Sequence, residues 1–87
     1  MSASYLHSSA AALAHSGPCQ LVAVQATLAS GAGTVAVHDG LDATGELVLT
    51  LAVSSSSASL APAIPIALHH GLYAAVTNGC EYTLVWV

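Results

Sequence analysis

The chain has 87 residues, of which 55% are hydrophobic and 5% are charged, and it contains neither lysine nor arginine. Nucleic-acid-binding proteins use these cations to neutralise phosphates, and anionic lipid surfaces attract the same cations, so we expect no nucleic acid and no membrane among its partners. The length predicts one domain. Because so few charges protect a free monomer against association, we expect much of the surface to be covered in an assembly.

Residues 1–16, MSASYLHSSAAALAHS, are rich in alanine and serine and contain no Asp, Glu, Lys or Arg. They lack a basic region and a long apolar run, so we do not expect a signal peptide. Alanine favours a helix, but residues 8–16 are few, begin with serines and precede a Gly-Pro turn, so we interpret them as a strand. We predict an N-terminal arm or edge strand over residues 1–16, followed by a β-sandwich domain over residues 17–87.

The predicted arm has too many small side chains to form a core alone. Such a segment is ordered most readily by adding to the sheet edge of a neighbour or by lying on a partner surface. We therefore predict that Tyr5 and Leu6 are interface residues that anchor the arm.

Turn signals divide the rest of the chain into short segments rich in valine and leucine, which predict strands. These strands are expected over residues 19–29, 34–38, 47–53, 72–77 and 81–87. An Asp-Gly turn follows the second, and an Asn-Gly pair, the strongest hairpin signal in the chain, joins the last two. Between them, residues 54–59 are serine-rich and predict a polar loop, and two prolines make residues 60–68 an edge strand or an extended segment.

Turn signals that recur about every 8–12 residues are typical of an all-β sandwich or barrel. The sequence therefore predicts an all-β fold, namely a small antiparallel β-sandwich of jelly-roll-like type in a single domain.

Three motifs in this order resemble a class of small virion proteins of tailed bacteriophages. They are GTVAVHDG, ATGELVLTLAV and a proline-containing segment that leads into GLYAAVTNG. The resemblance covers residues 33–87, and its motifs are structural. This chain departs from the class in having His69 and His70 before GLY and in lacking any basic residue.

The resemblance implies a non-enzymatic, multimeric structural protein that decorates or cements a phage capsid and stabilises the head. Its partners would be the major capsid protein and other copies of itself in a homotrimer, on the capsid exterior after assembly in the host cytoplasm. The alternatives are the base or head-proximal module of a phage fibre or tail, and a carbohydrate-binding β-sandwich. The number of copies per particle would separate decoration from a fibre or tail role.

Candidate metal and catalytic residues do not form recognisable patterns. Asp39, Asp42 and Glu46 could ligate a hard cation, but their spacing matches no calcium loop. The histidines lack the spacing of zinc ligands; they are His7, His15, His38, His69 and His70. No G-x-S-x-G motif is present, and the strand patterns around Cys19 and Cys80 predict reduced, buried and inert thiols. We therefore expect no enzyme, no catalytic residue, no metal and no cofactor.

Trp86 is the largest side chain and lies one residue from the end of the sequence. In the last predicted strand, alternation places it on one face with Tyr82 and Leu84. That face is either part of the core or, because aromatic side chains often concentrate binding energy, part of a subunit contact. Trp86 therefore joins Tyr5 and Leu6 as a candidate interface residue.

Overall fold

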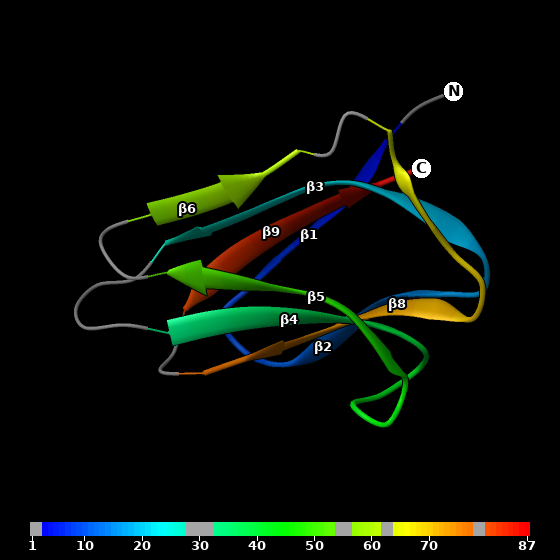
Figure 1. The fold of residues 1–87 in the computed structure, drawn as a ribbon, viewed down its shortest axis with the longest axis horizontal. Helices are drawn as coiled ribbons and strands as arrows, with labels where there is room; N and C mark the ends of the chain where they lie inside the picture. The colour runs from blue at the N-terminus through cyan, green and yellow to red at the C-terminus, as the bar shows by residue number, and fades with distance from the viewer. Residues whose placement is uncertain (1–2, 28–32, 54–56, 62–63, 78–79) are drawn as a thin grey trace.

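Two antiparallel sheets pack face to face in the computed structural model, which describes residues 3–27, 33–53, 57–61, 64–77 and 80–87 (Figure 1). The five-stranded sheet contains β1 (Ser4–Ser8), β9 (Glu81–Trp86), β3 (Cys19–Thr27) and β6 (Ser57–Leu60) in that order, with β7 (Ile66–Leu68) also paired to β3. The four-stranded sheet contains, in order, β2 (Ala12–Ser16), β8 (Gly71–Val76), β4 (Gly33–Asp39) and β5 (Glu46–Val53). The described residues contain no helix.

The strand order is that of a jelly roll. The first strands of the chain pair with the last ones, β1 with β9 and β2 with β8. The next strand in each sheet is β3, which pairs with β9, and β4, which pairs with β8. Two sheets built in this way are the double Greek key of the jelly-roll class. The predicted fold, a small single-domain antiparallel β-sandwich of jelly-roll type, is confirmed.

β6 and β7 share one strand position. β6 pairs with Val24–Thr27 of β3, and β7 pairs with Cys19–Leu21 of the same strand. Proline has no N–H to donate to a ladder, so the proline-containing segment interrupts the pairing between them. The prediction of a loop over residues 54–59 is wrong for Ser57–Ser59, because pairing with β3 overrides the low strand propensity of serine. Residues 54–56, and the Asn-Gly pair predicted as a hairpin turn, lie outside the described residues.

The N-terminal segment forms two strands where one was predicted. β1 is an edge strand that pairs with β9, and β2 is an edge strand that pairs with β8, so both join sheets of their own chain. The expectation that a neighbour orders this segment does not describe the structure. Leu6 and Ala14 pack against the core from the two strands, and the hydroxyl of Tyr82 donates a 2.7 Å hydrogen bond to the carbonyl oxygen of Ala10 between them.

The core lies between the sheets and consists of inward-facing aliphatic and aromatic side chains. Its buried members are Leu21, Val24, Ala26, Val35, Val37, Val53, Leu68, Leu72, Ala74, Cys80, Tyr82, Leu84 and Trp86. Strict alternation in β4 and β9 gives this inner face. In β3 the alternation is broken, because an irregularity in its pairing with β9 between Leu21 and Ala23 lets both Leu21 and Val24 point inward.

Asp39, at the end of β4, is the one buried charged side chain among the described residues and is 9% exposed. Its carboxylate accepts a 2.8 Å hydrogen bond from the N–H of His70 and 3.1 Å hydrogen bonds from the N–H of His69. The N–H of His70, and those of His69 and Gly71, lower the pKa of Asp39 more than burial raises it. Asp39 therefore does more than form its own Asp-Gly turn, because it fixes the distant connection between β7 and β8.

Gly71 follows this connection at a point where backbones cross closely. A Cβ atom at this position would lie 2.6 Å from the carbonyl oxygen of Gly40 and 3.0 Å from that of His15. Only glycine fits there without a shift of backbone.

Candidate interaction surfaces

The three predicted interface residues do not form one surface. Tyr5 points outward from β1 and is 74% exposed. Leu6, next to it, packs against the core. Trp86 is 8% exposed and lies in the core, with its ring centroid 6.1 Å from that of His15. Of the two alternatives for Trp86, the structure therefore places it in the core, because Tyr82, Leu84 and Trp86 all face the opposite sheet.

The outer face of the four-stranded sheet is apolar and is called the apolar face below. One row of side chains crosses all four strands and contains Leu13, Tyr73, His38 and Leu47. Leu13 is 43% exposed and Leu47 is 56% exposed, at the two ends of the row. In the middle, the rings of His38 and Tyr73 meet edge to face with centroids 6.1 Å apart. The row is therefore a continuous hydrophobic and aromatic strip.

Two further rows of small side chains complete the apolar face. Ala75, Ala36 and Thr50 form the second row. Thr77, Thr34 and Ala52 form the third, in which the hydroxyls of Thr34 and Thr77 are 3.1 Å apart and satisfy each other. The described part of this face holds no Asp, Glu, Lys or Arg. These two rows consequently consist of small side chains and are free of fixed charge over three strands.

The outer face of the five-stranded sheet is polar and is called the polar face below. Its central row contains His7, Thr83, Gln25 and Ser59, and a neighbouring row contains Glu81, Thr27 and Ser57. On the other side, Tyr5 lies in a row with Val85 and Ala23. Two adjoining open hollows, of about 200 and 390 Å³, lie along the polar rows and share Gln25, Ala26 and Thr27.

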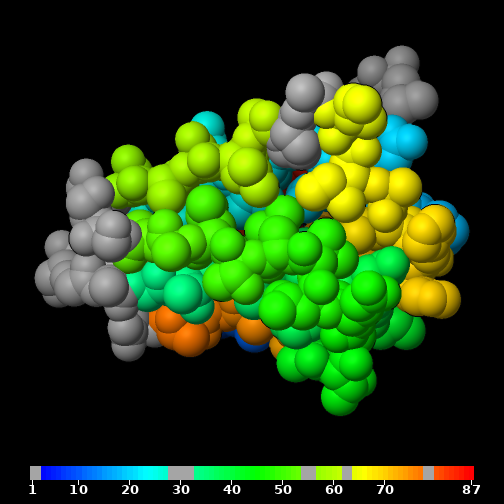
Figure 2. Space-filling model, in the orientation of Figure 1, coloured from blue at the N-terminus to red at the C-terminus, as the bar shows by residue number. Residues whose placement is uncertain are grey.

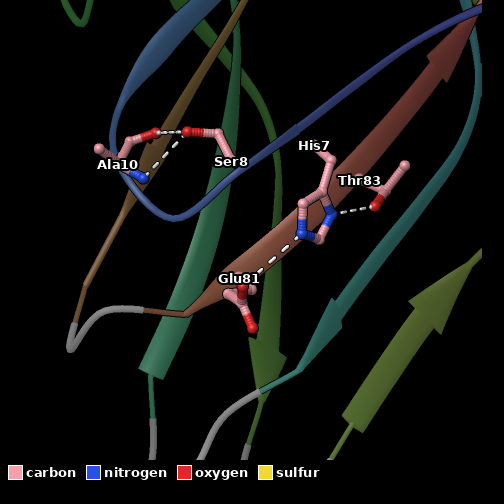
Figure 3. Close-up of polar contacts among 5 residues, drawn as sticks. All are labelled: His7, Ser8, Ala10, Glu81 and Thr83. Carbon is pink, nitrogen blue, oxygen red and sulfur yellow. Dashed lines mark hydrogen bonds and ion pairs between the residues drawn. The ribbon is translucent and has the colours of Figure 1, made fainter.

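His7 is fixed on the polar face by two neighbours from β9. Its Nδ1 lies 2.8 Å from the hydroxyl of Thr83, and its Nε2 lies 3.6 Å from a carboxylate oxygen of Glu81 (Figure 3). The side chains of His7 and Glu81 are both more than half exposed, so water screens this pair. The face thus offers hydroxyl, amide, imidazole and carboxylate groups, which can form hydrogen bonds with a polar ligand.

The remaining ionisable groups do not converge. The carboxylate of Asp39 is occupied by backbone N–H groups, and that of Asp42 accepts a 2.9 Å hydrogen bond from the N–H of Thr44. Glu46 is exposed. Within residues 3–27, 33–53, 57–61, 64–77 and 80–87, no group of three or more His, Cys, Asp or Glu residues could hold a metal ion. The same part of the chain contains no helix that is long and apolar enough to cross a membrane.

Cys19 and Cys80 are free thiols. Cys80 is buried, and its sulfur lies 3.3 Å from the carbonyl oxygen of Thr77. Burial raises the pKa of the half-buried Cys19, and the charge of Asp39 adds to the effect. A raised pKa leaves little thiolate at neutral pH, so Cys19 is a poor nucleophile.

The sequence reasoning missed both cross-strand faces. Alternation in a single strand shows which residues share a side, for example Tyr73 and Ala75 in β8, but it does not identify the neighbouring strand. The contact between Leu13 and Tyr73 joins residues 60 positions apart in the sequence. A jelly-roll strand order, applied to the predicted strands, was the one signal that could have assembled these rows.

Comparisons of the chain with family models, with curated proteins and with solved structures give no match. Because a fold alone does not specify a function, the function has to be inferred from the two outer faces.

Proposed function

We propose that this protein is a structural component of a bacteriophage virion, a decoration or cement protein that binds the major capsid protein on the outside of the head. It stabilises the shell and catalyses no reaction. The observation that carries this proposal is the apolar face, a sheet surface with exposed Leu13 and Leu47 and no Asp, Glu, Lys or Arg among its described residues. Contiguous exposed apolar surface of this kind marks protein interfaces.

The physical basis of the contact is burial of the apolar face against the shell. Each Å² of apolar surface removed from water contributes roughly 25 cal/mol, and part of this gain is offset by lost freedom of motion. The small side chains of Ala36, Ala75 and Ala52 allow a second surface to approach closely. The polar face would then point to solvent, in agreement with its hydrogen-bonding side chains.

A pair of substitutions on central strands tests this orientation. Ala36→Glu places a carboxylate in the middle of the apolar face, and burying an unpaired charge costs several kcal/mol. The occupancy of the variant on assembled particles should fall at least about tenfold at matched concentration. Gln25→Glu adds the same charge to the polar face and serves as the control, with occupancy unchanged.

The readout is the number of copies per purified particle, measured by quantitative mass spectrometry, with the fluorescence of Trp86 as a check on folding. Absence of the wild-type protein from particles would overturn the proposal. So would equal occupancy of wild type and Ala36→Glu.

The polar face favours a second candidate, a carbohydrate-binding module. Its rows carry one acidic group and neither lysine nor arginine, which suits a neutral ligand with many hydroxyls, and Tyr5 offers an exposed aromatic ring beside them. Binding to a neutral oligosaccharide that is lost in Gln25→Ala, while particle occupancy is unaffected, would identify this role.

A further inference from the structure

The two sheets have four outer strand positions, and three of them are poorly suited to pairing with another chain. β1 and β2 have five residues each, and the pairing of β2 with β8 is irregular between Leu13 and His15. β6 and β7 have four and three residues and are separated by a proline-containing segment. Short strands, irregular pairing and prolines are the devices by which proteins protect sheet edges.

β5 is the exception. It has eight residues, contains no proline, lysine or arginine, and carries its one acidic residue, Glu46, at its first position. Its pairing with β4 is irregular only near its start, opposite Val37 and His38, and is regular from Leu49 to Val53. Within the described part of the chain, β5 pairs with β4 alone.

The free side of β5 faces solvent. β5 lies beside β6 at the side of the sandwich that faces the viewer in Figure 1, and Figure 2 shows its atoms as an uncovered band along that side. Thr50 and Ala52 are exposed, and Leu49 and Leu51 are half-buried. In an edge strand, roughly half of the backbone N–H and C=O groups point away from the sheet and lack a partner in it. An edge that is regular and uncharged from Leu49 to Val53 is a template for another strand.

We propose that β5 of one copy pairs in antiparallel orientation with β5 of a second copy, about a two-fold axis perpendicular to the sheet. The two four-stranded sheets then form one continuous eight-stranded sheet. Directly opposed residues in an antiparallel pair lie on the same face of the sheet. The axis must therefore lie between one residue and the same residue of the second copy, so that this residue is opposed to itself.

The pairing is centred on Thr50. In this register Thr50 meets Thr50 of the second copy on the apolar face, within the part of β5 that pairs regularly with β4. The irregularity before Leu49 leaves Leu47 on the apolar face and Val53 in the core, so the regular ladder does not extend to a pair of these two residues. On the inner side, Leu49 meets Leu51 of the second copy. Cross-strand threonine and aliphatic pairs are favourable, and this register brings no pair of like charges together.

The association is expected to be weak. A strand of eight residues is about 27 Å long, and its edge buries less than the roughly 800 Å² per partner of a standard interface, which would be about a sixth of the 4718 Å² surface of this chain. The dissociation constant of the pair should therefore lie in the micromolar range or above.

This inference goes beyond the proposed function. The pair joins two apolar faces side by side, and it does so whether or not a capsid protein binds those faces. It differs from the homotrimer that the phage resemblance implies, because an isologous contact between identical edges closes with two copies.

Sedimentation equilibrium of the free protein, from about 1 µM to about 1 mM, tests the pairing. A two-chain species should form reversibly. Thr50→Lys should weaken it by at least about tenfold, because two lysines would be opposed at the axis. Ser4→Lys adds the same charge to the exposed start of β1 and should leave the dissociation constant unchanged.

A cross-link tests the register. In a Cys19→Ser background, Thr50→Cys should form a disulfide between copies, since opposed Cα atoms in a ladder are about 4.5–5.5 Å apart and disulfides span this distance. A monomer at every concentration, a three-chain species, or a two-chain species that Thr50→Lys does not weaken would each overturn the proposal. Failure to cross-link a paired protein would overturn the register. None of these measurements involves particles, so failure here is distinct from failure of the proposed capsid contact.

Discussion

Replacing Asp39 by asparagine should destabilise the fold more than the removal of the charge of any other acidic residue among the described residues. The carboxylate is 9% exposed and holds the N–H groups of His69 and His70 with hydrogen bonds of 2.8–3.1 Å. Hydrogen bonds to a charged group contribute about 1.5–3 kcal/mol each. Asparagine keeps one acceptor oxygen but turns an NH₂ donor toward the remaining N–H. We therefore expect a loss of about 2–3 kcal/mol in the free energy of unfolding.

Urea unfolding followed by the fluorescence of Trp86, the single tryptophan and a buried one, measures this loss. With a denaturant dependence of about 1 kcal/mol per M for a small domain, the midpoint should fall by about 2–3 M at pH 7. Asp42→Asn is the matched control. It removes the same charge from an exposed loop position, where water replaces the lost partner, so its midpoint should change much less.

The pH dependence has a definite sign. The folded-state pKa of Asp39 lies below its unfolded value of about 3.9, so its contribution to stability is complete above about pH 4 and is lost as the pH falls through the folded-state pKa. The difference between wild type and Asp39→Asn should therefore shrink in acid. A midpoint within about 0.5 M of wild type at pH 7, or a difference that persists undiminished at about pH 2, would refute this account of Asp39.

Two further substitutions test the connections around the core by thermal unfolding. Tyr82→Phe removes the 2.7 Å hydrogen bond to the Ala10 carbonyl and should cost about 1 kcal/mol, or about 4–8 °C in Tm; an unchanged Tm would show that water satisfies that carbonyl equally well. Gly71→Ala should cost about 2–3 kcal/mol, because its Cβ would meet the Gly40 oxygen at 2.6 Å. Gly17→Ala has open space and only the strain of φ +103°, so it should cost less, about 1–2 kcal/mol, and the reverse order would contradict the close approach at Gly71.

The sequence predicted most strands well where hydrophobic alternation is strong. Residues 34–38 correspond to β4, residues 47–53 to β5 and residues 81–87 to β9, each within one residue at the ends. Alternation works there because one face of each strand is buried against the opposite sheet.

The N-terminal strands and β6 were harder to predict, because their side chains are mainly alanine and serine. Their strand conformation comes from pairing with β9, β8 and β3, not from local propensity. The same limit applies to Asp39. An Asp-Gly pair is an ordinary turn signal, and nothing near it in the sequence indicates that its carboxylate binds backbone 30 residues further on.

The candidate surfaces depended on topology even more. Val35 and Ala36 are adjacent apolar residues, yet Val35 is fully buried in the core and Ala36 lies on the apolar face. Alternation alone cannot separate a strand covered by its own second sheet from one whose outer face is free to meet another protein. The distinction required the pairing partners of each strand.

The positions of the four acids distinguish the two outer faces. In a chain without lysine or arginine, a carboxylate in the interior needs backbone N–H groups as partners, and Asp39 has them. Asp42 lies in the loop between β4 and β5, and Glu46 is the first residue of β5. Glu81 lies on the polar face, so none of the four acids lies on the apolar face. The free edge of β5 borders that same face. Both proposed contacts therefore use the four-stranded sheet. A charge introduced at Ala36 tests its face by occupancy on particles, and a charge at Thr50 tests its edge by association of the free protein.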